Sequence, residues 1–300
     1  GLPLFVDSLA LYYNKDIFNA AGIALPPKTW TDVHAIVKRT TKFHPVEPGQ
    51  IEQHGIALGT GRNVNRAPDV LSVLMLQNGT PMVNEKGEIA FGNSEGALQA
   101  LRFLTDFANP SKDTYTWTLS SDYSIDAFAE GEAAMMVNYS YHLPTIRLKN
   151  PRLHFAVAPL PQTEGTAPQE ALTYAGYWAF AVNRQTPNAQ NAWEFIRFLT
   201  SRDAARAYLT RSGYPPARND LVDAFKTDPR VGVFAEQSLI ARTWRQADNR
   251  VVDRVFAEIL DDVVAGRDTV EGALRRAAGQ IQASASAQQA PSQRGLQPVP

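Results

Sequence analysis

A polar and aromatic segment, Asn138-Tyr139-Ser140-Tyr141-His142, directly follows the brief apolar run 133–137. Such a run is typical of a strand covered on both faces, as in parallel sheets. Ligands of open α/β sheets lie beyond the carboxyl ends of the strands. Aromatic rings offer apolar area with a polar tip, so this segment predicts a binding site for a small polar ligand. The alternative is that Tyr139 and Tyr141 pack beneath the loop.

Asp7 is an acid within an apolar run that includes Val6 and Leu9. An unpaired charge buried in such a run would be costly. We therefore expect a ligand hydroxyl or a basic partner to satisfy the Asp7 carboxylate. The alternative is a purely structural ion pair.

Further candidates lie in Gly176-Tyr177-Trp178, at the start of a run predicted to be a buried strand over 178–182. Side chains alternate across a strand, so at most one of the two aromatic residues should face a cleft. We favour Tyr177, with core packing of both as the alternative. Trp244 is a weak candidate, because a lone tryptophan is more often a core residue.

Residues of other chemistries are missing or badly spaced. There is no cysteine, which excludes disulfides and thiol nucleophiles. Gly59-Thr60-Gly61 lacks the third glycine of a dinucleotide fingerprint, and no phosphate-binding loop, nucleophile elbow or zinc-protease motif occurs. The five histidines are scattered. The pattern predicts no catalytic residue, no metal and no cofactor.

Composition is that of a globular protein with no nucleic-acid partner. The 300 residues carry 29 Lys+Arg against 30 Asp+Glu, a net charge of -1, whereas nucleic-acid binders show a basic excess. No apolar run approaches the roughly 20 residues that span a bilayer. The chain opens with Gly1 inside a strand-like run, which suggests a fragment lacking its N-terminal part.

Strand-like and helix-like segments alternate, which favours α/β architecture. A loop is expected over 43–54, and the tail from 283 is expected to be disordered because it is rich in Ala, Ser, Gln and Pro. Strands are expected within 4–13 and at 56–58, 133–137, 155–158 and 178–182, and helices at 14–21, from 29, from 94, at 124–130, 188–208 and 250–280.

Four stretches, in order, resemble the family 1 extracellular solute-binding proteins, the maltose-binding-protein-like sugar-binding components of ABC transporters. They are the run from Val6 to Asp16 containing Tyr-Tyr-Asn-Lys-Asp and followed by Pro27-Lys28-Thr29-Trp30, the run from Phe128 to Asn138, the run from Tyr174 to Val182, and the run from Gly266 to Leu274.

The resemblance implies a periplasmic-binding-protein-like (type II) α/β fold of two lobes, with roughly the first third of the usual chain, most of the N-terminal lobe, absent. The implied division is 1–8, a first crossover strand; 9–175, the main part of the C-terminal lobe; 176–222, a piece of the N-terminal lobe; 223–282, C-terminal lobe helices; and 283–300, the tail. Such a fragment alone is expected to bind weakly or not at all.

The resemblance also assigns roles to individual residues. Tyr141 stands at the position of an aromatic residue that stacks on sugar, and Asp7 where a carboxylate often faces the cleft. Gly176 stands in a segment that approaches the sugar closely. Weaker candidates are Arg62 and Asn63, in a turn that could equally be solvated, Tyr214 and Arg218, for which packing is favoured, and Trp244, in a segment that often lines the cleft.

The function expected from the resemblance is extracellular capture of a sugar or oligosaccharide and its delivery to the permease of an ABC importer, without turnover. A monomer in the periplasm or outside the cell is expected, with a lipid anchor as one option. Glucosides, galactosides, oligosaccharides and glycerol phosphodiesters are all ligands in this broad group. The alternatives are a carbohydrate-active enzyme of the glycosidase kind, which needs two carboxylates about 5–9.5 Å apart, and a solute-binding sensory module.

Overall fold

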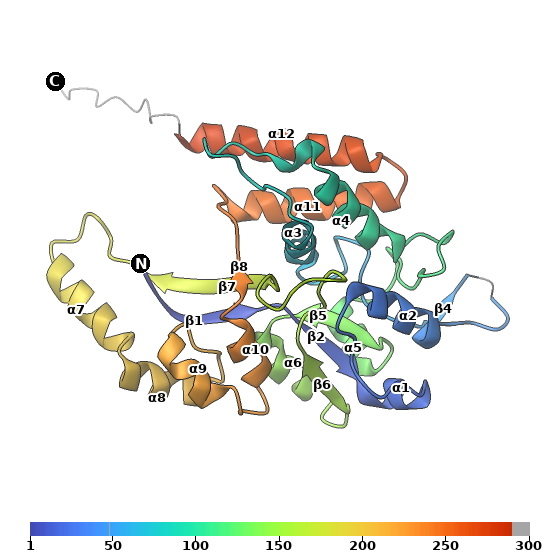
Figure 1. Cartoon of the computed structure of the whole chain (residues 1–300), viewed down its shortest axis with the longest axis horizontal. Coiled ribbons are helices and arrows are strands. Elements are labelled where there is room, and N and C mark those ends of the chain that lie inside the picture. The colour runs from blue at the N-terminus through green and yellow to red at the C-terminus, as the bar shows by residue number, and fades with distance from the viewer. Residues whose placement is uncertain (48, 290–300) are drawn as a thin grey trace, which may run out of the picture.

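The computed structural model describes residues 1–47 and 49–289. Its buried apolar side chains form a large cluster and a small one. The small cluster contains Leu4, Leu209 and Leu221 and continues to Ala235, beyond the boundary predicted at residue 222. In Figure 1 the helices α7 to α9 form an arm beside the larger unit, and β1 (Leu2–Ser8) and β7 (Thr173–Phe180) run between the two. The predicted α/β class is confirmed.

The sheet of the large unit has the order β5-β2-β6, formed by Met135–Asn138, Ala10–Asn14 and Phe155–Ala158. Both pairings are antiparallel, so the expectation of a parallel sheet is wrong. The premise of that expectation, a strand covered on both faces, holds nonetheless, because all four residues of β5 are buried. The strands β2 and β5 are buried almost throughout, whereas β6 is partly buried, and burial alone does not distinguish parallel from antiparallel pairing.

A second sheet joins the two units through antiparallel pairing of β1 with β7, and β8 (Ala241–Arg242) adds to β7 in parallel. The strand predicted within residues 4–13 is therefore two strands, β1 and β2, in different sheets. The expected buried strand at 178–182 is also wrong. Residues 178–180 form the exposed end of β7, where Trp178 is 79% exposed, and residues 181 and 182 lie beyond the strand.

The helices of the large unit follow the predicted segments closely. In α2 a capping box joins Thr29 and Asp32, each side chain accepting from the other residue's backbone N–H, the reciprocal arrangement that starts helices. Short 3-10 turns at Phe91–Asn93 and Ser140–His142 complete this part. The helices are α1 (Lys15–Ala20), α2 (Trp30–Thr40), α3 (Ala67–Gln77), α4 (Glu95–Asp106), α5 (Ser124–Glu130) and α6 (Leu143–Lys149).

The single helix predicted over 188–208 is two helices, α7 (Ala189–Leu199) and α8 (Arg202–Ser212). The break falls at Ser201, whose backbone is extended and occupies the N-cap position of α8, a position that serine favours. Of α7 only Ile196 is buried, and Phe195 is 60% exposed. The arm is completed by α9 (Asn219–Phe225), and α10 (Gly232–Gln237) packs between α9 and β1.

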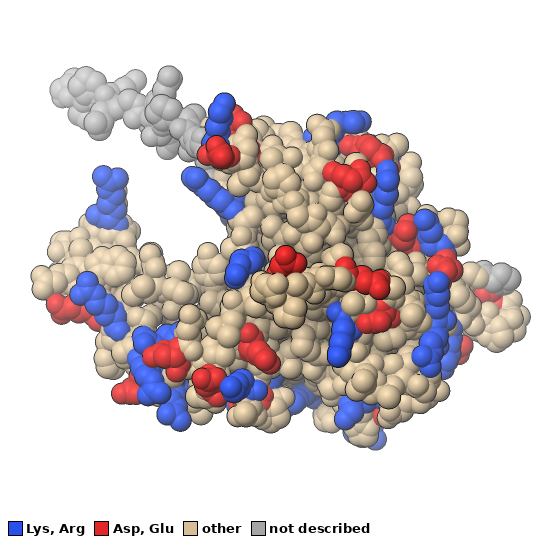
Figure 2. All heavy atoms as spheres, in the orientation of Figure 1, with Lys and Arg blue, Asp and Glu red and all other residues tan. Residues whose placement is uncertain are grey.

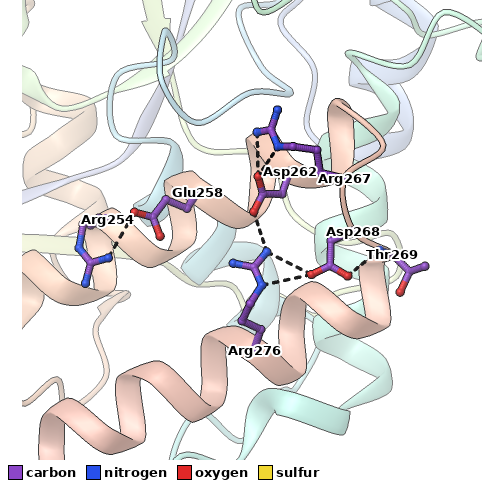
Figure 3. A network of polar contacts seen from close by, with 7 residues as sticks. All are labelled: Arg254, Glu258, Asp262, Arg267, Asp268, Thr269 and Arg276. Atoms are coloured by element: carbon purple, nitrogen blue, oxygen red, sulfur yellow. Dashed lines mark hydrogen bonds and ion pairs between the residues drawn. The ribbon is translucent and has the colours of Figure 1, made fainter.

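Two long helices, α11 (Asn249–Val264) and α12 (Val270–Gln289), pack on α3 and α4. Figure 3 shows the ion pairs at their junction, where Arg276 donates to Asp262 at 2.7 Å and to Asp268 at 3.1 Å. Because α12 continues to Gln289, the prediction of a disordered tail is wrong over 283–289. The rest of that predicted tail lies outside the described residues.

Two predicted loop or strand segments differ from the structure. Residues 56–58 form no strand, although the Ala57 amide donates to the Met135 carbonyl at 2.9 Å beside the central sheet. The predicted loop 43–54 contains a small hairpin of β3 (Lys42–Phe43) and β4 (Ile51–Gln53). Among the described residues no helix has the length and apolar character needed to cross a membrane.

Candidate functional site

A cavity of about 930 Å³ lies between the two clusters. Figure 2 shows the molecule hollowed between the arm of α7 to α9 and the larger unit, with acidic and basic residues interspersed over the visible face. One wall comes from β1 and β7, and the other from the start of α3, the segment after β5 and the start of α11. The lining residues are Phe5, Asp7, Arg66, Asp69, Tyr139, Tyr141, Tyr174, Ala175, Gly176, Tyr177, Trp178, Tyr214, Thr243, Trp244, Arg245, Gln246, Ala247, Asn249 and Asp253.

The floor of the cavity is a charged network centred on Asp69. Its Oδ2 accepts from Arg66 Nη2 at 2.6 Å and from the Tyr139 hydroxyl at 2.7 Å. Burial raises the pKa of Asp69, and the Arg66 charge and the Tyr139 hydrogen bond offset only part of that rise. Burial opposes the charge on Arg66, yet Asp69 and Asp253 (3.3 Å from Nη1) outweigh it and raise its pKa. The guanidinium is thus held between two carboxylates.

Arg66 has a φ of 58°, the only positive φ of a non-glycine residue in the described chain. It occupies the N-cap position of α3 in a left-handed conformation. Such a conformation costs a non-glycine residue of order 1–3 kcal/mol and persists where its surroundings fix it, often at functional sites. Here the ion pairs fix the side chain and aim it into the cavity.

Asp7 is buried, only 2% exposed, and no basic group pairs with it among the described residues. Its Oδ1 accepts from the backbone amides of Ser8 and Ser140, and its Oδ2 from the Ser140 hydroxyl at 2.7 Å. The basic partner and the alternative of a structural ion pair are therefore wrong, because the turn after β5 supplies the donors. A ligand hydroxyl as a partner of Asp7 stays a prediction. Burial raises the pKa of Asp7 to about 6, against the lowering effect of these hydrogen bonds.

Aromatic side chains form the open walls. Tyr141 is 41% exposed and stacks on Tyr139, with ring centroids 5.6 Å apart. On β7, Tyr177 and Trp178 both line the cavity, so the prediction that at most one of them faces it is wrong. This end of β7 stays paired with β1, but its side chains are exposed on both faces, and alternation therefore does not bury either ring.

Two further predicted residues line the same cavity. The Tyr214 ring stacks on Phe5, with centroids 4.4 Å apart, and Trp244 is buried, with its indole N–H donating to Ser72 Oγ at 3.4 Å. Trp244 is thus a core residue as well as a lining residue. The structure brings together seven of the predicted residues: Asp7, Tyr139, Tyr141, Gly176, Tyr177, Tyr214 and Trp244.

Gly176 lines the cavity, and its lack of a side chain has a packing reason as well. A Cβ at this position would lie 3.0 Å from Tyr139 Cε1, closer than an ordinary contact. Tyr139 is itself fully buried, and its hydroxyl is committed to Asp69. The glycine therefore makes room for the Tyr139 ring, which in turn supports Tyr141.

Three predicted residues lie outside the cavity lining. Asn63 is a structural residue whose amide donates to the Thr118 and Ser121 carbonyls. Its neighbour Arg62 is exposed at the same turn. Arg218 pairs with Asp220 at 2.9 Å on the surface of the arm. The turn after 56–58 does reach the site, but through Arg66, three residues beyond Asn63.

The residues missed from sequence are chiefly Arg66, Asp69, Trp178 and the neighbours of Trp244, namely Thr243, Arg245, Gln246, Ala247, Asn249 and Asp253. Asp69 carries the same signal as Asp7, an acid within an apolar run, here that of α3. A group of three carboxylates, Asp122, Glu130 and Glu132, could approach a metal ion, but all three are exposed. Such acidic groups are common without an ion.

The site and the fold define an α/β binding protein with a ligand cavity between two packed units. The sequence pattern of the bacterial extracellular solute-binding protein family matches residues 1–233, and the chain belongs to this family. This confirms the resemblance and the prediction of a binding protein rather than an enzyme. Membership implies a periplasmic or extracellular location.

Individual relatives agree with this assignment. A probable ABC transporter-binding protein of Deinococcus radiodurans is 25% identical, covering 94% of this chain and 68% of its own. The maltodextrin-binding protein MdxE of Bacillus subtilis is 23% identical over 72% of this chain, which spans only 49% of that relative. Among solved structures, a cyclo/maltodextrin-binding protein complexed with maltotetraose superposes with a TM-score of 0.76, at 22% identity, covering 94% of this chain and 70% of its own. This likeness confirms the type II periplasmic-binding-protein-like fold.

Proposed function

We propose that this protein binds a neutral sugar or oligosaccharide in the cavity between its two units and delivers it to the permease of an ABC importer. The observation that carries the proposal is the set of exposed rings, Tyr141, Tyr177 and Trp178, above a floor of fixed hydrogen-bonding groups. Rings present apolar area to the C–H faces of a sugar, and charged groups make strong hydrogen bonds to its hydroxyls. The names of the maltodextrin-binding relatives support the same ligand class.

The charges of the cavity favour a neutral ligand over a phosphate-bearing one. Three carboxylates, Asp7, Asp69 and Asp253, face two guanidinium groups, Arg66 and Arg245. Arg66 is already held by Asp69 and Asp253. A phosphate would therefore meet one uncommitted cation beside several acids, whereas a hydroxyl can donate to a carboxylate and accept from the guanidinium.

A ligand panel tests the proposed class. We expect neutral glucosides or oligosaccharides to change the tryptophan fluorescence and the amide NMR spectrum of the chain, because Trp178 is exposed at the cavity. Both measurements detect millimolar as well as micromolar affinity. Glycerol phosphate and a free amino acid serve as the contrasting ligands. Binding of either of these in this cavity, seen as shifts of the Tyr141 and Tyr177 amides, with no response to any carbohydrate would contradict the proposal.

Replacing Tyr141 by alanine should weaken binding of the responding sugar by about 1–3 kcal/mol, the cost of truncating an aromatic anchor. The matched control is Tyr208→Ala on α8. Tyr208 is exposed to a similar degree, 44% against 41%, and does not line the cavity. Titrations of both variants by NMR measure the difference. Equal affinities for the two variants would remove Tyr141 from the site.

A further inference from the structure

A second cavity, of about 430 Å³, lies at the opposite end of the central sheet. Strand β2 begins at Ala10, which pairs with Asn138 beside the first cavity, and ends at Asn14, which pairs with Phe155. The second cavity opens just beyond that end. Five residues of strand at about 3.3 Å each separate the two sites by roughly 15 Å. They are therefore distinct, and a ligand could occupy one without contacting the other.

The lining of this second cavity is basic. Lys15 comes from the start of α1, Arg147 from the last turn of α6, and His154 from the residue before β6. No acidic residue is among the lining residues. Asp16, which pairs with His154 at 3.3 Å, is the acid beside it. Within the described chain neither Lys15 nor Arg147 has a carboxylate at ion-pair distance.

Lys15 and Arg147 stand out because they share one hollow, not because they lack a partner. Among the described arginines Arg66 and Arg276 pair with aspartates, whereas Arg197 and Arg206 on the arm do not. On α6 itself the neighbouring Lys149 pairs with Asp126 at 2.8 Å. Arg147 and Lys15 thus leave two uncommitted cations at one hollow, which attracts a group of negative charge.

The remaining lining gives the hollow a defined shape. Leu153 and Phe155 supply a half-buried apolar surface. The Asn150 side chain is fixed, because its Nδ2 donates to the Ala129 carbonyl and its Oδ1 accepts from the Arg152 amide. A guanidinium binds two phosphate oxygens at once, and an ammonium adds a point charge. The apolar surface beside them suits an organic group attached to the phosphate.

We propose that this second cavity binds a phosphate ester, with Arg147 and Lys15 on the phosphate oxygens and Leu153 and Phe155 against the organic moiety. The ester could be a soluble organophosphate or the head group of an anionic phospholipid, since both present the same chemistry. The proposal stands independently of the sugar site, because it uses none of the residues of that cavity.

The test uses the chain labelled with ¹⁵N in two arms. In the first, glycerol phosphate is titrated and amide shifts are followed. In the second, the chain is sedimented with phosphatidylcholine vesicles with and without phosphatidylglycerol. We expect shifts centred on residues 15, 147, 150 and 154 in the first arm, or binding to the anionic vesicles alone in the second. A response in the first arm only identifies a soluble ester, and one in the second only identifies the head group.

The variant Lys15→Ala/Arg147→Ala should lose at least tenfold in affinity in the responding arm. The control variant Arg197→Ala/Arg206→Ala removes the same charge from exposed positions of α7 and α8, neither of which has an ion-pair partner among the described residues. An equal loss of affinity in the control would show that the effect comes from the net charge of the protein alone, and it would overturn the proposal. So would the absence of a response to millimolar glycerol phosphate and to the anionic vesicles. Failure here leaves the sugar titrations unaffected.

Discussion

Replacing Arg66 by methionine should lower the free energy of unfolding by about 3–4 kcal/mol at pH 7. The change leaves the Asp69 carboxylate, only 5% exposed, without its charged partner, and breaking a buried pair on one side costs about 3–5 kcal/mol. Methionine keeps the stem of the side chain and shares the steric cost of the positive φ at this position, so the difference isolates the charge. Chemical denaturation at several pH values measures it.

The loss of stability in Arg66→Met has an upper limit, because Asp69 can take up a proton instead of remaining charged without a partner. The ordinary pKa of an aspartate is 3.8, so neutralising it costs about 4 kcal/mol at pH 7 and less than about 2 kcal/mol at pH 5. The deficit of Arg66→Met should therefore shrink as the solution becomes more acidic. Adding Asp69→Asn to Arg66→Met should recover part of the stability at pH 7, because the uncompensated charge is then gone.

The matched control is Asp253→Asn. Asp253 is the second partner of Arg66, at 3.3 Å, but its side chain is 36% exposed. Exposed pairs contribute at most about 1 kcal/mol, so this variant should lose far less than Arg66→Met. Equal losses in the two variants, or a loss that does not change with pH, would show that Asp69 does not depend on Arg66 for compensation.

The secondary elements with strong local signals could be predicted from sequence. Thr29 and Asp32 specify the start of α2 through a capping box, and the glycine at 131 marks the end of α5 with a φ of 87°. Pairing partners could not be predicted in the same way. The apolar run of β5 reports only that both faces are covered, and its antiparallel register with β2 depends on residues more than a hundred positions away.

The residues of the candidate site also fall into those that local sequence features indicate and those that depend on distant parts of the chain. Tyr141 and Asp7 could be found because a ring that directly follows a strand and an acid in an apolar run are local features of the sequence. Arg66 could not, since its role depends on Asp253 of α11, which lies 187 residues further along the chain. The exposure of Trp178 could not be predicted from sequence either. Its apolar neighbours are typical of a core strand, yet the buried part of β7 ends before it.

Asp7 should make the protein less stable as the pH rises from about 4 to about 7. Burial raises its pKa from 3.8 to about 6, so within this window the folded state binds more protons than the unfolded state. The free energy of unfolding then falls with rising pH. A rise of the pKa to about 6 corresponds to a loss of about 3 kcal/mol in the free energy of unfolding. This loss is absent below pH 4, where both states are protonated, and complete above the folded pKa.

The variant Asp7→Asn isolates this contribution. Its oxygen can still accept from the Ser8 and Ser140 amides, and its amide can donate to the Ser140 hydroxyl, so the hydrogen bonds of the turn are retained. The stability of wild type minus that of the variant, measured by denaturation across the pH range, should fall by about 3 kcal/mol between pH 4 and pH 7.

Asp32→Asn supplies a control of opposite sign. Hydrogen bonds from the backbone amides of Lys28 and Thr29 lower the pKa of Asp32, so its ionised form stabilises the fold above pH 3.8 and that contribution is lost as the pH falls through the folded pKa. The same subtraction should therefore rise with pH below about pH 4 for Asp32, and fall between about pH 4 and pH 7 for Asp7. A flat difference for Asp7 would mean that the donors around Ser140 compensate its charge fully, and that its burial costs the fold nothing.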